Sequence, residues 1–174
     1  MTTHHTLLRP ARLDDLDEIT DLHTQARTAY YRAGGLPDTD PELHSHPEAL
    51  SRRRAMWRRA VEDDALTVLC ATQADELVGI LAMGPPLDAD VSPTTAAQLH
   101  QIHVRPGHWG QGIGTHLHTA FVDRLREASL STGVLEHWSR NTRAHAFYTR
   151  HAWHPDGHHR PGPADTTYIR LRRS

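Results

Sequence analysis

The apolar residues of this chain recur with two different periods, which predict short strands interleaved with helices. Residues 6–12 are expected to form a strand. A helix over about 14–32 follows, because four apolar residues there lie on one stripe at helical spacing. These residues are Leu16, Ile19, Leu22 and Ala26. A polar, acidic loop at 37–47 leads to a second predicted helix over about 47–62, opened by Pro47.

The middle of the chain predicts a β-hairpin followed by a third strand. Residues 65–72 and 76–84 are apolar runs joined by a short polar segment, which is typical of two paired strands. After a loop at 88–95, residues 97–104 predict another strand, with Leu99, Ile102 and Val104 as its apolar positions.

The last third alternates helices and strands. A turn at 105–111 leads into a helix over 112–128, and residues 133–138 predict a strand. A helix over 141–151 and a final strand over 166–172 complete the order β-α-α-β-β-β-α-β-α-β. This order predicts one domain over residues 1–174, of the α+β class, with a mixed sheet covered by helices.

Composition narrows the possible functions. The chain has 174 residues, a formal net charge of −2, one cysteine (Cys70) and 16 histidines. The charge balance excludes a strongly basic nucleic-acid binder and a polybasic membrane patch. We expect no signal peptide and no membrane span, and hence a cytoplasmic protein. All 19 basic residues are arginine, which excludes mechanisms that need a lysine. Cys70 is expected to be buried and inert.

A glycine-rich turn is the most informative stretch. Gly110, Gly112 and Gly114 stand between a predicted strand and a predicted helix. Glycines let a ligand approach the backbone, and the free N–H groups of a first helical turn attract anions. The stretch lacks the GxGxxG fingerprint of dinucleotide-binding proteins and the GK[ST] of P-loops. It therefore predicts an anion site, or a tight turn without a ligand.

Two blocks of sequence resemble the GNAT (Gcn5-related) N-acetyltransferase family. IHVRPGHWGQGIGTHLH at 102–118 resembles its acetyl-CoA-binding strand, turn and helix, with Trp109 in place of the usual Arg or Gln. NTRAHAFYTRHAW at 141–153 resembles its N-x-x-A-x-x-x-Y segment, with Ala152 in place of Gly. The resemblance implies the acyl-CoA N-acyltransferase fold, with a mostly antiparallel sheet. It also implies acetyl-CoA as co-substrate and no metal.

The same resemblance assigns the residues around acetyl-CoA. The backbone of 109–115 would cradle the pyrophosphate, and the backbone of 102–104 would bond the pantetheine arm. Asn141 would cap its helix and contact the cofactor. The full expected set is Ile102, His103, Val104, Trp109, Gly110, Gln111, Gly112, Ile113, Gly114, Thr115 and Asn141.

Acetyl transfer to an amine benefits from a base and from an acid for the leaving thiolate. Many family members carry a glutamate base where this chain has Gln98, which cannot accept a proton. His100, two residues on, is therefore our candidate base, directly or through a water. Strand alternation places Gln98, His100, Ile102 and Val104 on one face and His103 on the other. By resemblance, Tyr148 is the general acid.

By the same resemblance, the acceptor site would be bounded by residues 30–49 and 156–168, and we expect a small-molecule amine there. The acidic side chains of Asp38, Asp40 and Glu42 are candidates to attract a cationic amine. A homodimer is common in the resembled family. Two alternatives stay open: a non-catalytic acyl-CoA-binding or regulatory domain, and a histidine-rich metal protein. Against the metal, no histidine pair has cysteine partners, and i,i+2 rings on a helix point apart.

Overall fold

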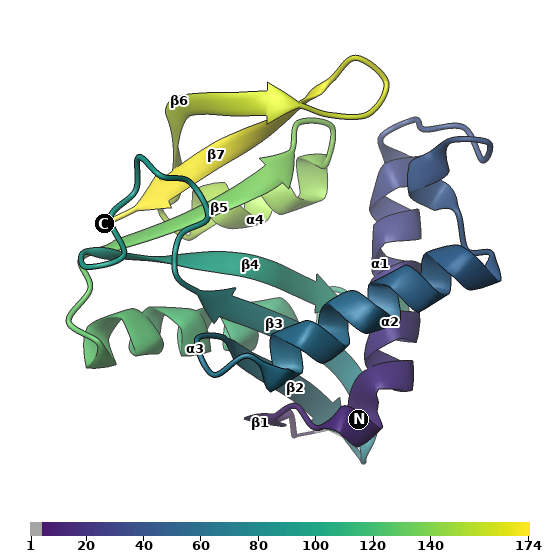
Figure 1. Cartoon of the computed structure of the whole chain (residues 1–174), viewed down its shortest axis with the longest axis horizontal. Coiled ribbons are helices and arrows are strands. Elements are labelled where there is room, and N and C mark those ends of the chain that lie inside the picture. The colour runs from purple at the N-terminus through teal and green to yellow at the C-terminus, as the bar shows by residue number, and fades with distance from the viewer. Residues whose placement is uncertain (1–4) are drawn as a thin grey trace.

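The sheet has seven strands in the order β1-β2-β3-β4-β5-β7-β6 (Figure 1). The computed structural model describes residues 5–174. The strands are β1 (Leu7–Pro10), β2 (Thr67–Gln73), β3 (Glu76–Gly84), β4 (Ala96–Val104), β5 (Thr132–Trp138), β6 (His154–Pro161) and β7 (Thr167–Arg173). Neighbouring strands run antiparallel except β4 and β5, which are parallel. The expected mixed α+β architecture is confirmed.

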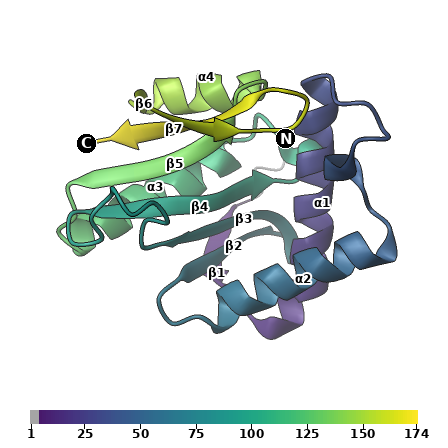
Figure 2. The ribbon, with the colours of Figure 1, turned by 45° about the horizontal axis from the view of Figure 1, so that its top comes forward.

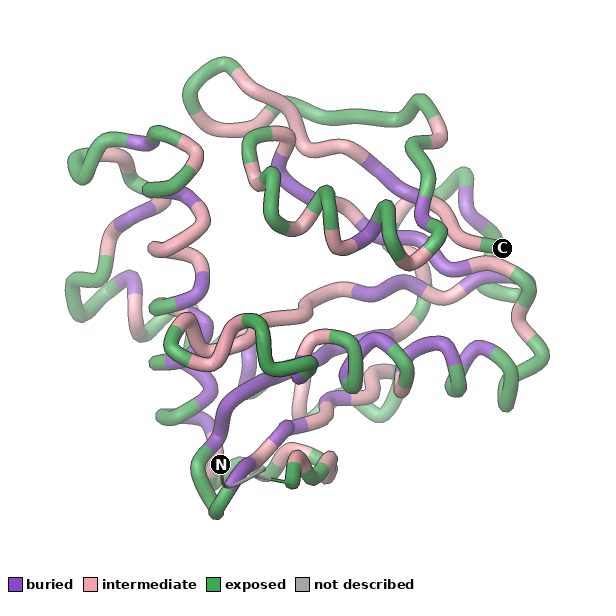
Figure 3. Tube along the Cα trace, turned by 180° about the vertical axis from the view of Figure 1, so that it is seen from behind, coloured by how far each residue is buried: buried purple, intermediate pink, exposed green. Residues whose placement is uncertain are grey.

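Four helices cover the two faces of this sheet. They are α1 (Leu16–Ala33), α2 (Pro47–Glu62), α3 (Ile113–Glu127) and α4 (Thr142–Arg150). Views from the front and from behind show α1 and α2 on one face and α3 and α4 on the other (Figures 1 and 3). The sheet therefore sits between two helical layers.

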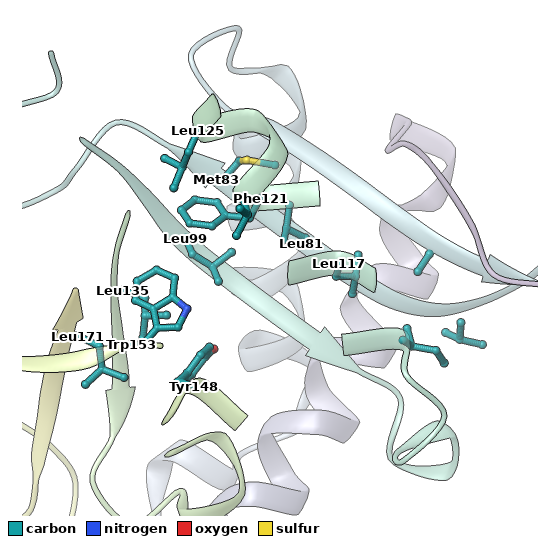
Figure 4. Packing of buried hydrophobic residues seen from close by; sticks show 14 residues of the cluster. Leu81, Met83, Leu99, Leu117, Phe121, Leu125, Leu135, Tyr148, Trp153 and Leu171 are labelled. Carbon is teal, nitrogen blue, oxygen red and sulfur yellow. The ribbon is translucent and has the colours of Figure 1, made fainter. Parts of the chain in front are cut away.

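Each face has its own apolar core. Leu16, Ile19 and Leu22 of α1 pack with Trp57 of α2 against β2 and β3. On the other face, α3 and α4 enclose a larger cluster that includes Leu117, Phe121, Tyr148 and Trp153 (Figure 4). Tyr148 thus belongs to the core as well as to the candidate site.

The sheet opens between β4 and β5. Their parallel pairing covers only three residue pairs, from Ala96–Thr132 to Gln98–Val134. β4 stays paired with β3 as far as Val104, while β5 diverges from it on the side of β7 and α4 (Figure 2). The second half of β4 therefore has an edge that β5 does not pair.

A β-bulge at His100 corrects the predicted facing of β4. Met83 of β3 pairs with Leu99 and Ala82 pairs with Gln101, so His100 is the extra residue. A bulge shifts the alternation of all residues beyond it. Ile102 and Val104 therefore pack toward α3 together with Leu99, whereas His103 contacts His23 of α1. The prediction that His103 lies on the face opposite Ile102 and Val104 is confirmed, whereas the prediction that His100 shares the face of Ile102 and Val104 is wrong.

The predicted helices and strands are otherwise present, with one strand missed. β6 is an edge strand, bonded on one side only, to β7. Its sequence, HPDGHHRP, has two prolines, a glycine and no apolar alternation, so nothing local indicated a strand. Within residues 5–174, none of the helices combines the length and the apolar character that crossing a membrane requires.

Candidate active site

Two cavities meet above the open edge of β4. The larger has a volume of about 630 Å³ and the smaller about 280 Å³. Six residues line both cavities: Tyr30, Ile102, His103, Asn141, Ala144 and Tyr148. They come from α1, from β4 and from α4 with its N-cap, which lie far apart in the sequence. Two ligands entering from opposite sides would meet at these six residues.

The smaller cavity lies at the beginning of α3. Gly110 and Gly112 adopt left-handed φ angles of 78° and 80°, which glycine tolerates best. A Cβ atom added at either position would meet nothing within 4 Å, so the backbone is open to a ligand. The first N–H groups of α3 have no carbonyl partner inside the helix and attract anions. Of the eleven residues expected to hold the cofactor, all but Gln111 line this cavity.

The peptide groups of β4 divide between β3 and the open edge. Arg105 N–H donates to Val78 O at 2.8 Å, which fixes the alternation of the antiparallel pair. By that alternation His103 bonds β3, while Ile102 and Val104 direct their peptide groups toward the open edge. The Val104 carbonyl already accepts the Trp109 indole N–H at 2.9 Å. Ile102 N–H and C=O and Val104 N–H are thus the peptide groups that this alternation directs toward the open edge, beside the smaller cavity that both residues line.

Two arginines of α4 also line the smaller cavity, and sequence reasoning missed both. Arg143 places its guanidinium 4.4 Å from the centre of the Trp109 ring, and Arg150 follows about two turns later on the same helix. Guanidinium groups suit phosphate recognition. The sequence shows that the two arginines are seven residues apart and so lie on one side of α4. Only the packing of α4 beside the glycine turn shows that this side lines the cavity.

Tyr148 occupies the junction of the two cavities. The side chain is buried beside Trp153 (Figure 4). Burial raises the pKa of its phenol above the ordinary value, so the group stays protonated at neutral pH. Among residues 5–174 its hydroxyl has no hydrogen-bond partner, which leaves the proton available to a ligand. Asn141 begins the helix that carries Tyr148 and accepts the Ala144 N–H at 3.1 Å, as its predicted capping role requires.

His100 lines the larger cavity. Its Nε2 lies 2.9 Å from the Pro85 carbonyl oxygen, and this bond requires a proton on Nε2. In the neutral ring Nδ1 is then the basic nitrogen. Burial lowers the pKa of His100, and the bond to Pro85 partly opposes that shift.

Gln98, at the position of the expected base, has a structural role. Its Oε1 accepts the Leu87 N–H at 2.8 Å and so ties the loop after β3 to β4.

His103 lines both cavities but is a weak base. Its ring lies 4.4 Å from that of His23, and its Nε2 lies 2.6 Å from Gln101 Oε1. Burial, assisted by the nearby charge of Arg27, lowers the pKa of His103 to about 3. At neutral pH its ring is therefore uncharged and suited to positioning a ligand by hydrogen bonds.

The larger cavity is bounded by the two segments that the sequence proposed for the acceptor. Aromatic rings of Tyr30, Tyr31, Trp138 and Tyr168 line it. Of the three acidic residues expected there, only Glu42 lines the cavity, where it pairs with Arg27. Asp38 bonds Arg32, and Asp40 caps the turn that begins at Pro41, so neither takes the expected place.

Other groups with candidate chemistry are engaged elsewhere. Cys70 is buried, and burial raises its pKa to about 12, as expected of an inert thiol. Asp88, Glu136 and His158 bring ligand atoms within 4.8 Å of one another, a cluster that the sequence did not indicate. Asp88 bonds Arg170 and Glu136 bonds Arg160, so internal cations already neutralise both carboxylates.

Comparisons with known proteins agree with this geometry. Residues 18–153 match the acetyltransferase (GNAT) family. An N-acetyltransferase from Staphylococcus aureus Mu50 superposes with a TM-score of 0.74 at 13% identity, covering 98% of each chain.

An acetyltransferase from Thermus thermophilus gives a TM-score of 0.71 at 17% identity, covering 99% of each chain. The PaiA N-acetyltransferase of Thermoplasma acidophilum, solved in complex with coenzyme A, gives 0.68 at 13% identity, over 95% of this chain and 98% of that one. No curated protein is similar enough in sequence to count as a match.

Proposed function

This chain belongs to the acetyltransferase (GNAT) family, and we propose that it transfers the acetyl group of acetyl-CoA directly to a primary amine of a small molecule. The observation that supports this most is the position of Tyr148 where two cavities meet, as a protonated phenol without a hydrogen-bond partner in the described part of the chain. A direct transfer needs two substrates side by side, with a proton donor at their point of contact.

The smaller cavity fits acetyl-CoA. A pyrophosphate could bind to the first N–H groups of α3, to the open backbone at the glycines and to the two arginines of this cavity. The peptide groups of Ile102 and Val104 at the open edge suit the amide-containing arm of the cofactor. When bound there, acetyl-CoA supplies a thioester whose acetyl carbon accepts the amine and whose thiolate leaves. The residues of this chain then have two tasks, to take a proton from the amine and to give one to the sulfur.

His100 is the proposed proton acceptor. The bond from its Nε2–H to Pro85 leaves Nδ1 free to receive a proton, and the same carbonyl stabilises the imidazolium that results. His100 is the bulged residue of β4 and lines the larger cavity, whereas Ile102 also lines the smaller one, so the imidazole stands back from the junction of the two cavities. A single water in the larger cavity is therefore the proposed carrier between the amine and Nδ1.

Tyr148 is the proposed proton donor. Because burial raises its pKa, the phenol still carries its proton when the carbon–sulfur bond breaks beside it. The leaving thiolate is expelled into the same buried site, where desolvation raises its proton affinity as well, so the phenol O–H can donate to the sulfur. Protonation of the sulfur prevents the reverse attack and completes the transfer.

One observation favours a second function, a non-catalytic acyl-CoA-binding domain. Gln98 stands where many relatives carry a base, and its side chain is committed to Leu87. Binding and turnover separate the two functions. A thermal-shift titration with acetyl-CoA, CoA and NAD measures binding, and release of CoA thiol with a broad amine panel measures turnover.

We expect stabilisation by acetyl-CoA and CoA but not by NAD, with a gain of about 2.7 kcal/mol at 100 times the dissociation constant. We also expect amine-dependent release of CoA. Binding without release on any amine would leave only the non-catalytic function. No stabilisation by either CoA ligand would refute both functions.

A further inference from the structure

The larger cavity carries an excess of positive charge. Four arginines line it, Arg27, Arg52, Arg53 and Arg160, together with two carboxylates, Glu42 and Glu136. Arg27 pairs with Glu42 and Arg160 pairs with Glu136. Within residues 5–174, Arg52 and Arg53 have no carboxylate partner. The cavity is therefore cationic in a chain whose formal net charge is −2.

Arg53 is held in place by neutral groups. It projects from α2, and its two terminal nitrogens donate to Thr24 Oγ1 at 3.0 Å and to the His44 carbonyl at 2.7 Å. These bonds fix the guanidinium without neutralising its charge. Burial and the charge of Arg27 lower the pKa of Arg53, and the charge of Glu42 partly opposes that shift. A fixed, half-buried cation at a cavity wall is costly for a folded chain unless an anion binds beside it.

We propose that Arg53 anchors an anionic oxygen group of the acceptor, so that the substrates are amines that also carry a carboxylate or a phosphonate. This inference rests on the proposed function, because it assigns the acceptor of that same site. A guanidinium matches such groups with two parallel hydrogen bonds. Arg52, exposed on the same helix, adds attraction at the mouth of the cavity.

The other lining residues narrow the acceptor further. Tyr30, Tyr31, Trp138 and Tyr168 supply apolar and aromatic surface for the body of the molecule. Both carboxylates of the cavity are already paired, so it offers no free anion to a polycation such as a polyamine. The positive charge also disfavours a protonated amine and so favours the neutral form that reacts.

Matched amines test this inference. Phenylalanine, its phosphonate analogue and phenethylamine share a ring and an amine and differ in the anionic group, and tryptophan with tryptamine gives a second pair. We expect kcat/KM for at least one anionic member to exceed that of the plain amine by about 10- to 100-fold, as charged hydrogen bonds provide. The two anionic members together distinguish a carboxylate site from a phosphonate site.

Variants of α2 locate the effect. Arg53→Met should raise KM for the anionic members with little change in kcat, and Arg53→Lys should restore part of the loss. Arg58→Met is the matched control, because Arg58 is an exposed residue of α2 that pairs with Glu62. Thermal unfolding of each variant shows that it is folded.

A binding measurement separates this inference from the proposed function. Titration calorimetry in the presence of CoA compares N-acetylphenylalanine and its phosphonate analogue with N-acetylphenethylamine. Binding of an acid that depends on Arg53 supports the anion site, even where no amine is turned over. Binding without turnover would refute acetyl transfer and leave the anion site standing. Equal turnover of plain and anionic amines, unaffected by Arg53→Met, would overturn the anion site and leave acetyl transfer standing. Absence of Arg53-dependent binding and turnover would also overturn it.

Discussion

The indole N–H of Trp109 donates to the carbonyl oxygen of Val104 at 2.9 Å and so ties the glycine turn to the end of β4. The guanidinium of Arg143 lies over a face of the same ring. Trp109 therefore joins three elements that line the smaller cavity: the strand, the turn and α4. It also occupies a carbonyl that would otherwise face the cavity, which leaves Ile102 as the main acceptor on that edge.

Trp109→Phe should weaken CoA binding by about 2- to 10-fold, the usual effect of one net hydrogen bond. Phenylalanine keeps a ring beneath Arg143 but lacks the N–H that holds the turn. Titration calorimetry with CoA measures the change. Trp109→Arg, which places the family's usual residue there, is the comparison. Unchanged affinity in Trp109→Phe would show that the turn is ordered without this bond.

Gly112→Ala should destabilise the fold by about 1–2 kcal/mol, because its φ of 80° is unfavourable for a residue with a Cβ. It should also weaken CoA binding, since the new methyl group stands on the open face of the turn. Gly107→Ala is the matched control, because the space around its Cβ is equally open and its φ is not left-handed. Urea unfolding and CoA titration compare the two. Equal effects of both substitutions would contradict the role given to the left-handed backbone.

Tyr148→Phe should lower kcat by about 100-fold and leave CoA affinity nearly unchanged, because the ring keeps its place in the core and loses only the acidic proton. Steady-state release of CoA thiol and a CoA titration measure the two quantities. A kcat equal to that of the unmodified chain would show that the thiolate needs no donor.

His100→Gln should remove the acid limb from the pH profile of kcat. His100 accepts a proton only while neutral, so activity falls as pH decreases through its pKa, which burial places below 6.5. Glutamine cannot accept that proton, so we expect a lower rate without this limb. Measurement at saturating amine reports the groups of the complex. An unchanged limb in the variant would assign the titration to another group.

Acid should destabilise the fold partly through His118. This residue is buried on α3, its Nε2 accepts the Trp153 indole N–H at 2.9 Å, and burial lowers its pKa to about 4. In the unfolded chain the pKa returns to about 6.5. Between these values the unfolded chain binds the extra proton, so this contribution to stability is full above pH 6.5 and is lost as pH falls toward 4, at about 1.4 kcal/mol per pH unit.

His118→Gln should reduce that pH dependence, because a glutamine oxygen accepts the indole bond without titrating. His116→Gln, at an exposed position of the same helix, should not change it. Urea unfolding between pH 7 and pH 5 gives the slopes. Identical slopes in all three proteins would assign the acid sensitivity to other histidines.

The sequence by itself determined most of the architecture. Helices and strands could be predicted where apolar residues recur with a regular period over a short stretch of chain. The stripe of Leu16, Ile19 and Leu22 on α1 and the apolar runs of the hairpin are examples. The glycine turn and Tyr148 were recognisable for a similar reason, because their spacing along the chain is short and specific. β6 was not predicted because its residues show no alternation of apolar and polar positions. Its strand conformation depends on the hydrogen bonds to β7.

Only the tertiary structure decided which side chains share a cavity. The bulge at His100 depends on the register between β3 and β4, and one extra residue there moves His103 to the face of α1. In the sequence, Arg53 and Arg143 cannot be told from ordinary surface arginines. Long-range packing places Arg53 in the wall of the larger cavity and Arg143 over the indole ring of Trp109. Local periodicity specifies the elements, whereas the charge and shape of the site arise from contacts between residues that are distant along the chain.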